Sequence, residues 1–158
     1  MRIFAISAFS VSFLLISSPA SSDEIPSRYD RLSKAVSRIV EVQFSDGEDG
    51  AVPMLKACYE QNSVPNAGLT TALEECLAQD IAYSNLSTGF YRQMAAKANR
   101  SPVGWQPEYT TGEAMKTRVF RAMSLAGFTE PRLTSELKQI AAIALKALVP
   151  AVEAGPRK

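Results

Sequence analysis

The sequence contains no histidine. This absence excludes the Ser-His-Asp and Cys-His catalytic arrangements, histidine-ligated zinc sites, and proton transfer by an imidazole near neutral pH. The sequence also lacks a glycine-rich phosphate-binding loop of either standard form. The catalytic option that is left is a pair of carboxylates, as in glycan hydrolysis.

The acidic residues do not favour that option. Glu74, Glu75 and Asp80 are close in sequence, but adjacent glutamates at the start of a predicted helix are explained by their interaction with the helix dipole. A carboxylate-based, glycan-active enzyme is therefore the third of our hypotheses. We expect no catalytic residues and no cofactor.

Cysteine is scarce as well, with only Cys58 and Cys76. Their spacing is not the Cys-x-x-Cys of redox catalysts. Between them, residues 62–68 (Asn-Ser-Val-Pro-Asn-Ala-Gly) are typical of a loop, and helix-like sequence flanks this loop on both sides. We therefore predict two antiparallel helices joined by a disulfide, which would stabilise the fold by about 3 kcal/mol.

The N-terminus carries an apolar run, residues 3–16, that is shorter than the roughly 20 residues of a transmembrane helix. It follows Met1-Arg2 and precedes Ser18-Pro19-Ala20, small residues of the kind that a signal peptidase recognises. We predict a signal peptide over residues 1–20, cleaved after Ala20, and no transmembrane segment after cleavage. The protein would then be periplasmic or secreted, where paired cysteines are expected.

The mature chain would have no net charge. The full sequence has 17 basic and 16 acidic residues, and cleavage of the signal peptide removes Arg2, which leaves 16 of each. A dense basic face of the kind that binds nucleic acid is not evident, so we expect no nucleic-acid partner. The acidic stretch 45–50 fails the calcium-loop template: with Gly50 at the invariant glycine, Lys56 takes the place of the bidentate glutamate. We predict no metal site, and a turn in which Asp49 caps the next helix.

Apolar residues recur at helical spacing in five segments, residues 27–44, 51–61, 71–98, 110–126 and 131–149. A chain of this size buries one core, so residues 21–158 are predicted to form a single all-α domain. We expect a small helical bundle of about five helices with one disulfide-stapled helical hairpin. The last segment is the most apolar and is the predicted central helix; Pro150 should end it and leave a loose tail from about residue 151. Weak helix-forming sequence at 85–89 leaves open whether the third helix is continuous through Gly89.

The only tryptophan, Trp105, lies in a predicted loop at residues 99–109. It is either an anchor for a partner, as tryptophan often is at interfaces, or a plug over the end of the bundle. Lys116, Arg118 and Arg121 form a basic strip on the outer side of the fourth helix, which is either a solvated face or a contact for an anionic partner. Our leading hypothesis is an exported protein, not an enzyme, that binds a protein or envelope component as an inhibitor, immunity factor or envelope adaptor, with these four residues as its contact surface.

The alternative hypothesis is a carrier of a small apolar ligand in a pocket between helices. Such a pocket would be lined by five large side chains: Tyr83, Phe90, Met94, Met115 and Met123. They occur at the spacing of core residues, so ordinary packing is the stronger explanation of this pattern.

Glu75-Cys76 is followed fifteen residues later by Tyr91 on the same predicted helix, with Cys58 as the partner cysteine. This pattern loosely resembles the small envelope proteins related to lysozyme inhibitors of the LprI type. The positions at which an Asp and a Leu-Asn pair are expected between these residues hold Ser84 and Ser87-Thr88 here, and no later segment with Trp and Cys follows. The resemblance covers about a quarter of the chain and carries no functional residue over.

Overall fold

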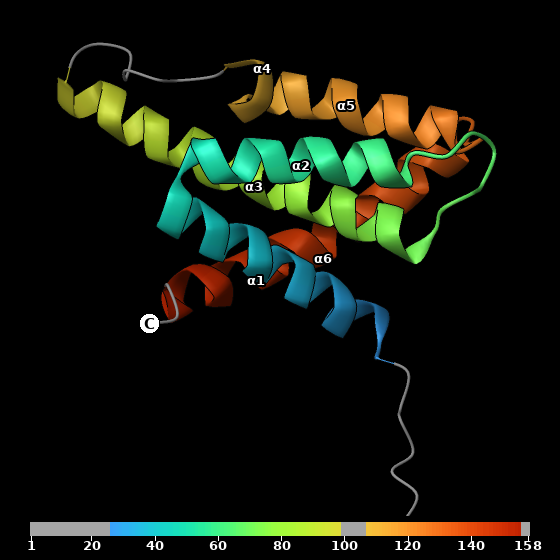
Figure 1. The fold of residues 1–158 in the computed structure, drawn as a ribbon, viewed down its shortest axis with the longest axis horizontal. Coiled ribbons are helices and arrows are strands. Elements are labelled where there is room, and N and C mark those ends of the chain that lie inside the picture. Colours follow the sequence, from blue (N-terminus) through green and yellow to red (C-terminus); the bar gives the residue numbers. More distant parts are fainter. Residues whose placement is uncertain (1–25, 99–106, 156–158) are drawn as a thin grey trace, which may run out of the picture.

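A computed structural model describes residues 26–98 and 107–155, and within these ranges the chain is all-α (Figure 1). The helices are α1 (Arg28–Asp46), α2 (Glu48–Asn62), α3 (Thr71–Ala98), α4 (Pro107–Thr110), α5 (Gly112–Leu125) and α6 (Arg132–Ala154). The predicted all-α bundle is confirmed, with α4 as a single additional turn. None of the helices in the described ranges is both long enough and apolar enough to cross a bilayer.

A single residue, Gly47, separates α1 from α2, and its φ of 64° and ψ of −149° turn the chain abruptly. The turn predicted over residues 45–50 is confined to this glycine, because helix occupies both sides of it. Gly50 permits the tight junction, since a Cβ at that position would lie 2.6 Å from the Cβ of Asp46. Asp49 lies in the first turn of α2 and does not cap it. Across the described residues, no three His, Cys, Asp or Glu side chains come together as a group that could hold a metal ion.

The centre of the bundle is α3, which contacts all the other helices. Every residue from Cys76 to Ser84 is buried, because neighbouring helices surround this part of α3. Two of them, Ala78 and Ala82, are small and allow those neighbours to approach closely. The helix is continuous through Gly89, and its C-terminal end projects past α1 and α2 (Figure 1).

The predictions that the last helix is central and ends at Pro150 are both wrong. α6 packs one face on α1 and α3, and leaves Leu145 44% and Val149 59% exposed on the other face. It continues through Pro150 to Ala154. Pro150 is on the exposed side, where a helix accommodates the proline ring by bending outward. Ala151 is 8% exposed, so the chain beyond the proline packs on the core instead of forming a loose tail.

Arg28, in the first turn of α1, connects three helices at one end of the bundle. Its Nη2 lies 2.7 Å from Glu74 Oε1 on α3 and 3.0 Å from Glu136 Oε2 on α6. Arg31 Nη2 lies 2.9 Å from the second carboxylate oxygen of Glu74. Glu74 therefore has a structural role in the ion pairs that join α1, α3 and α6.

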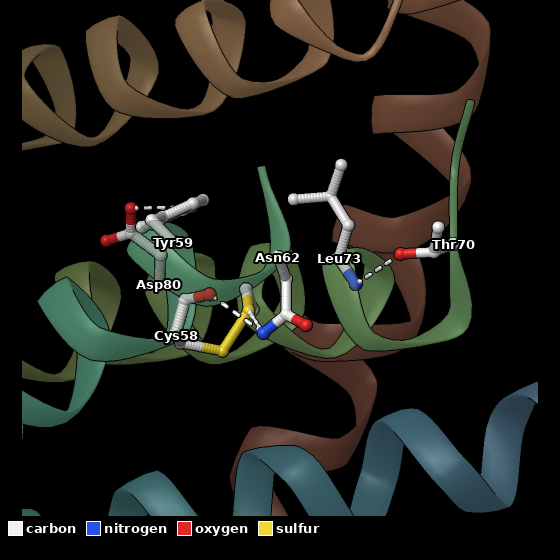
Figure 2. The surroundings of a disulfide bond; sticks show 7 residues. Cys58, Tyr59, Asn62, Thr70, Leu73 and Asp80 are labelled. Carbon is white, nitrogen blue, oxygen red and sulfur yellow. Dashed lines mark hydrogen bonds between the residues drawn. A yellow bond between two sulfur atoms is a disulfide. The ribbon is translucent and has the colours of Figure 1, made fainter. Parts of the chain in front are cut away.

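Cys58 of α2 and Cys76 of α3 form the predicted disulfide, with their Cα atoms 5.7 Å apart. Figure 2 shows that Asn62 lies beside it, where its Nδ2 donates a hydrogen bond of 2.8 Å to the carbonyl oxygen of Cys58. Thr70 Oγ1 accepts from the backbone N of Leu73 at 3.2 Å and so caps the start of α3. The stapled hairpin of α2 and α3 is confirmed.

Candidate functional site

The predicted basic strip on the fourth helix, α5 in the structure, is divided between two environments. Lys116 is exposed and forms an ion pair of 2.8 Å with Glu113. Arg121 is exposed and lines a pocket. Arg118 is not on the outer side, and its side chain is only 18% exposed. The prediction that all three residues form an outer strip is therefore wrong for Arg118, while Trp105 lies outside the described residues.

Arg118 turns inward to a carboxylate that is completely buried. Its Nε donates to Asp80 Oδ2 at 3.0 Å and its Nη2 donates to Asp80 Oδ1 at 2.6 Å. Asp80 is 0% exposed. The hydroxyl of Tyr59 donates a third hydrogen bond to this carboxylate, at 3.0 Å (Figure 2). The three residues connect α2, α3 and α5, and we call them the buried triad.

The remaining donors of Arg118 hold α4 in place. Nη1 donates to the backbone oxygen of Glu108 at 2.7 Å, and Nη2 donates to that of Tyr109 at 2.9 Å. Since α4 is a single turn, these two bonds fix its position against α5. The arginine therefore places the Tyr109 side chain as well as neutralising Asp80.

Burial shifts the protonation equilibria of the triad. Burial raises the pKa of Asp80, although the hydrogen bonds and charge of Arg118 oppose that shift. Burial also raises the pKa of Tyr59 well above 10, and the neighbouring Asp80 charge adds to the effect. For Arg118, burial opposes the charged form, but hydrogen bonding and attraction to Asp80 raise its pKa. Tyr59 therefore remains a neutral donor and Arg118 a fixed cation over the physiological range.

A pocket of about 450 Å³ opens beside the triad, between α2, α4 and α5. We call it the cationic pocket. It is lined by charged, aromatic and small side chains: Lys56, Tyr59, Glu60, Ser63, Tyr109, Arg118, Arg121, Ala122 and Leu125.

Two cations contact the Tyr109 ring at the wall of this pocket. Lys56 Nζ and Arg118 Cζ each lie 4.8 Å from the ring centroid, within the range of a cation–π interaction. Lys56 and Arg121 are exposed and form no ion pair within the described part of the chain. With Arg118 neutralised by Asp80, Glu60 is the single acid among the described residues that line the pocket with these two cations.

The side chains of the cationic pocket are therefore chemically suited to bind an anion beside an aromatic ring. Charge-assisted hydrogen bonds from lysine and arginine to a carboxylate are stronger than neutral ones. Asp80 has no exposed surface and both of its oxygens accept hydrogen bonds. It is therefore placed to hold Arg118 and not to exchange protons with a substrate.

The residues expected to line a carrier pocket do not come together. Tyr83 and Met123 are completely buried in the core. Phe90 and Met94 are 52% and 42% exposed on the projecting end of α3. Met115 is half-buried and lines a separate groove. The helical spacing of Tyr83 and Met123 therefore reflects packing in the core, whereas Phe90 and Met94 lie on a part of α3 that is largely exposed.

No sequence pattern brought Tyr59 and Asp80 together with Arg118. A signal for Arg118 was present, because it lies three residues after Met115 and four before Ala122 and so shares their inner face. Likewise, Asp80 lies four residues after a buried position of α3. A charged residue on an apolar helix face requires a partner of opposite charge. The positions of Asp80 and Arg118 on such faces therefore indicate an ion pair between the two helices.

The chain matches no protein-family model, and neither a curated protein nor a solved structure is similar enough to it to be matched.

Proposed function

We propose that this protein is an exported binding protein and that the cationic pocket takes an acidic segment of a partner protein. In this proposal a partner carboxylate lies between Lys56 and Arg121, and an adjoining apolar group packs on the Tyr109 ring. The observation that carries the proposal is the presence of two exposed cations, without ion pairs among the described residues, on a pocket with an aromatic wall.

The rigid setting of Tyr109 supports this proposal. The buried triad and the two bonds from Arg118 to α4 fix the ring before a partner arrives. Binding to a preorganised surface loses less conformational entropy than binding to a mobile one. A buried ion pair is often no more stabilising than apolar residues of the same volume, so its benefit here is the placement of α4.

Export is supported by the signal-peptide features of residues 1–20 together with the disulfide. Disulfides persist in oxidising compartments and are rare in reducing ones. A partner in the envelope or outside the cell follows from this location.

The two other hypotheses find less support. The carrier hypothesis lacks the pocket that its five residues were expected to line. The glycan-active enzyme would need two accessible carboxylates across a cleft, whereas Glu74 is paired with Arg28 and Arg31 and Asp80 is paired with Arg118.

The test measures binding of a fluorescein-labelled acidic peptide, built from glutamate and phenylalanine, to purified protein by fluorescence anisotropy. Exposed ion pairs contribute about 0.2–1 kcal/mol each, so the double variant Lys56→Gln with Arg121→Gln should weaken binding about 2- to 30-fold. The matched control is Lys34→Gln with Arg38→Gln, two exposed cations on α1, which should bind as the wild type does. A peptide with glutamine in place of glutamate should bind weakly to all three proteins. Equal weakening by both double variants, or equal binding of both peptides, would contradict the proposal.

A further inference from the structure

A second concave surface lies on a different face of α5, between α5 and α6 with α3 as its floor. α5 and α6 both pack on α3 but have few contacts with each other. The resulting groove has a volume of about 330 Å³ and almost entirely apolar walls. We call it the apolar groove. Its walls come from three helices: Ile81 and Asn85 of α3, Met115, Lys116, Val119 and Phe120 of α5, and Thr134, Leu137, Lys138, Ala141 and Leu145 of α6.

Large apolar side chains at this groove are exposed to solvent. Phe120 from α5 is 42% exposed and Leu145 from α6 is 44% exposed. Val149, one turn further along the same face of α6, is 59% exposed. Clusters of large exposed apolar residues on a small protein mark interaction surfaces more often than isolated ones do.

The two walls of the groove each carry a lysine. Lys138 on α6 is exposed and forms no ion pair in the described part of the chain. Lys116 on α5 pairs with Glu113, but the two side chains are 60% and 85% exposed, and such surface pairs are weak and easily exchanged. The groove therefore combines an apolar floor with a positive rim on both sides.

This combination favours one kind of occupant. A second copy bound through the same face would gather Lys116 and Lys138 of both molecules into one interface, because a twofold interface uses the same patch on each copy. An amphipathic helix with acidic residues beside its apolar face matches both the floor and the rim. It would place apolar side chains, one helical turn apart, between Phe120 and Leu145.

We infer that the apolar groove between α5 and α6 binds an amphipathic helix of a partner protein whose apolar stripe is flanked by acidic residues. The inference does not depend on the cationic pocket, because the two sites share no residue. The same partner can occupy both sites, or each site can serve a different one.

The experiment uses the purified protein and three labelled 18-residue peptides, with anisotropy as the readout. The first peptide is an amphipathic helix of leucine, alanine and glutamate. The second has the same composition in an order that scatters its leucines around the helix, and the third has lysine in place of glutamate. We expect the first peptide to bind at least tenfold more tightly than either of the others. Equal binding of the first two, or no binding of the first, would overturn the inference.

Matched variants locate the binding site. Phe120→Ala should weaken binding of the first peptide at least tenfold, while Phe44→Ala, which removes an equally exposed phenylalanine from α1, should not. Lys138→Glu, a substitution at an exposed position, should weaken binding of the glutamate peptide and strengthen that of the lysine peptide. The loss caused by Phe120→Ala should be equally large in a Lys56→Gln with Arg121→Gln background, in which binding of glutamate at the cationic pocket is weakened, and this separates the two sites.

Two further outcomes would assign the groove to another occupant. A dimer in sedimentation equilibrium that Phe120→Ala dissociates would identify a second copy and overturn the helix assignment. A lipid-sized mass retained in native mass spectrometry, and lost in Phe120→Ala, would identify a lipid ligand and would overturn it as well.

Discussion

Replacement of Arg118 by methionine removes the cation that neutralises Asp80 and leaves a carboxylate with no exposed surface. Asp80 would lose the hydrogen bonds of 3.0 Å and 2.6 Å from the guanidinium and keep the one from Tyr59. Removing one partner of a buried ion pair costs about 3–5 kcal/mol, whereas an exposed pair is worth about 0–1 kcal/mol. The expected loss is a large share of the roughly 5–15 kcal/mol by which a domain is stable.

The assay is urea unfolding followed by circular dichroism at 222 nm, with the disulfide intact. With a slope of about 2 kcal/mol per molar urea, a loss of about 4 kcal/mol lowers the midpoint by about 2 M. The double variant Asp80→Asn with Arg118→Met removes both charges and keeps an acceptor for Tyr59, so it should lie within about 2 kcal/mol of the wild type. A loss below 1 kcal/mol for Arg118→Met, or a double variant as unstable as the single one, would refute the role assigned to the buried triad.

Three further predictions concern stability. Replacing Cys58 and Cys76 with alanine should lower the free energy of unfolding by about 3 kcal/mol. An alkylating reagent should add no mass to the unreduced native protein, and the addition of two alkyl labels would contradict the disulfide. Because burial raises the pKa of Tyr59 well above 10, the unfolded chain releases this phenolic proton first. The free energy that Tyr59 contributes to folding is therefore fully present below about pH 10, and the free energy of unfolding falls above that pH by up to about 1.4 kcal/mol per pH unit. Denaturation at several alkaline pH values should show a smaller slope of this free energy against pH for Tyr59→Phe. An unchanged slope would count against the raised pKa of Tyr59. Gly50→Ala should destabilise the protein by about 1–3 kcal/mol, because the new Cβ would lie 2.6 Å from a side-chain atom of α1. Gly89→Ala, whose Cβ would meet nothing within 4 Å, should stabilise it by about 0.5–1 kcal/mol. Thermal unfolding measures both changes, and changes of the same sign would argue against the packing at the α1–α2 junction.

Local sequence signals were sufficient for the features that depend on local structure. Helical periodicity and the loop between Cys58 and Cys76 predicted the helices and the stapled hairpin correctly, because spacing and turn residues act over a few positions. The limits of α2 and α6 were wrong for a tertiary reason. Gly47 allows two helices to meet without a loop, and the packing of Ala151 on the core carries α6 through Pro150.

The candidate site depends on contacts between residues that are distant in sequence. Asp80 and Arg118 are 38 positions apart, and Tyr59 is 21 positions before Asp80. No local pattern brings such residues together. The basic strip on α5 was identified from its charges alone, so Arg121 was placed correctly on an exposed face and Arg118 was not. The direction of an arginine side chain depends on whether a buried acid lies within its reach.

The proposed contact between the cationic pocket and an acidic partner segment can be observed residue by residue. The most direct measurement is a nuclear magnetic resonance titration of isotope-labelled protein with the glutamate–phenylalanine peptide. We predict that the largest shifts fall on Lys56, Tyr109 and the Nε–Hε signal of Arg121. Larger shifts at Arg132, an exposed arginine that lines a separate pocket, with an unchanged Arg121 signal, would contradict the proposed contact.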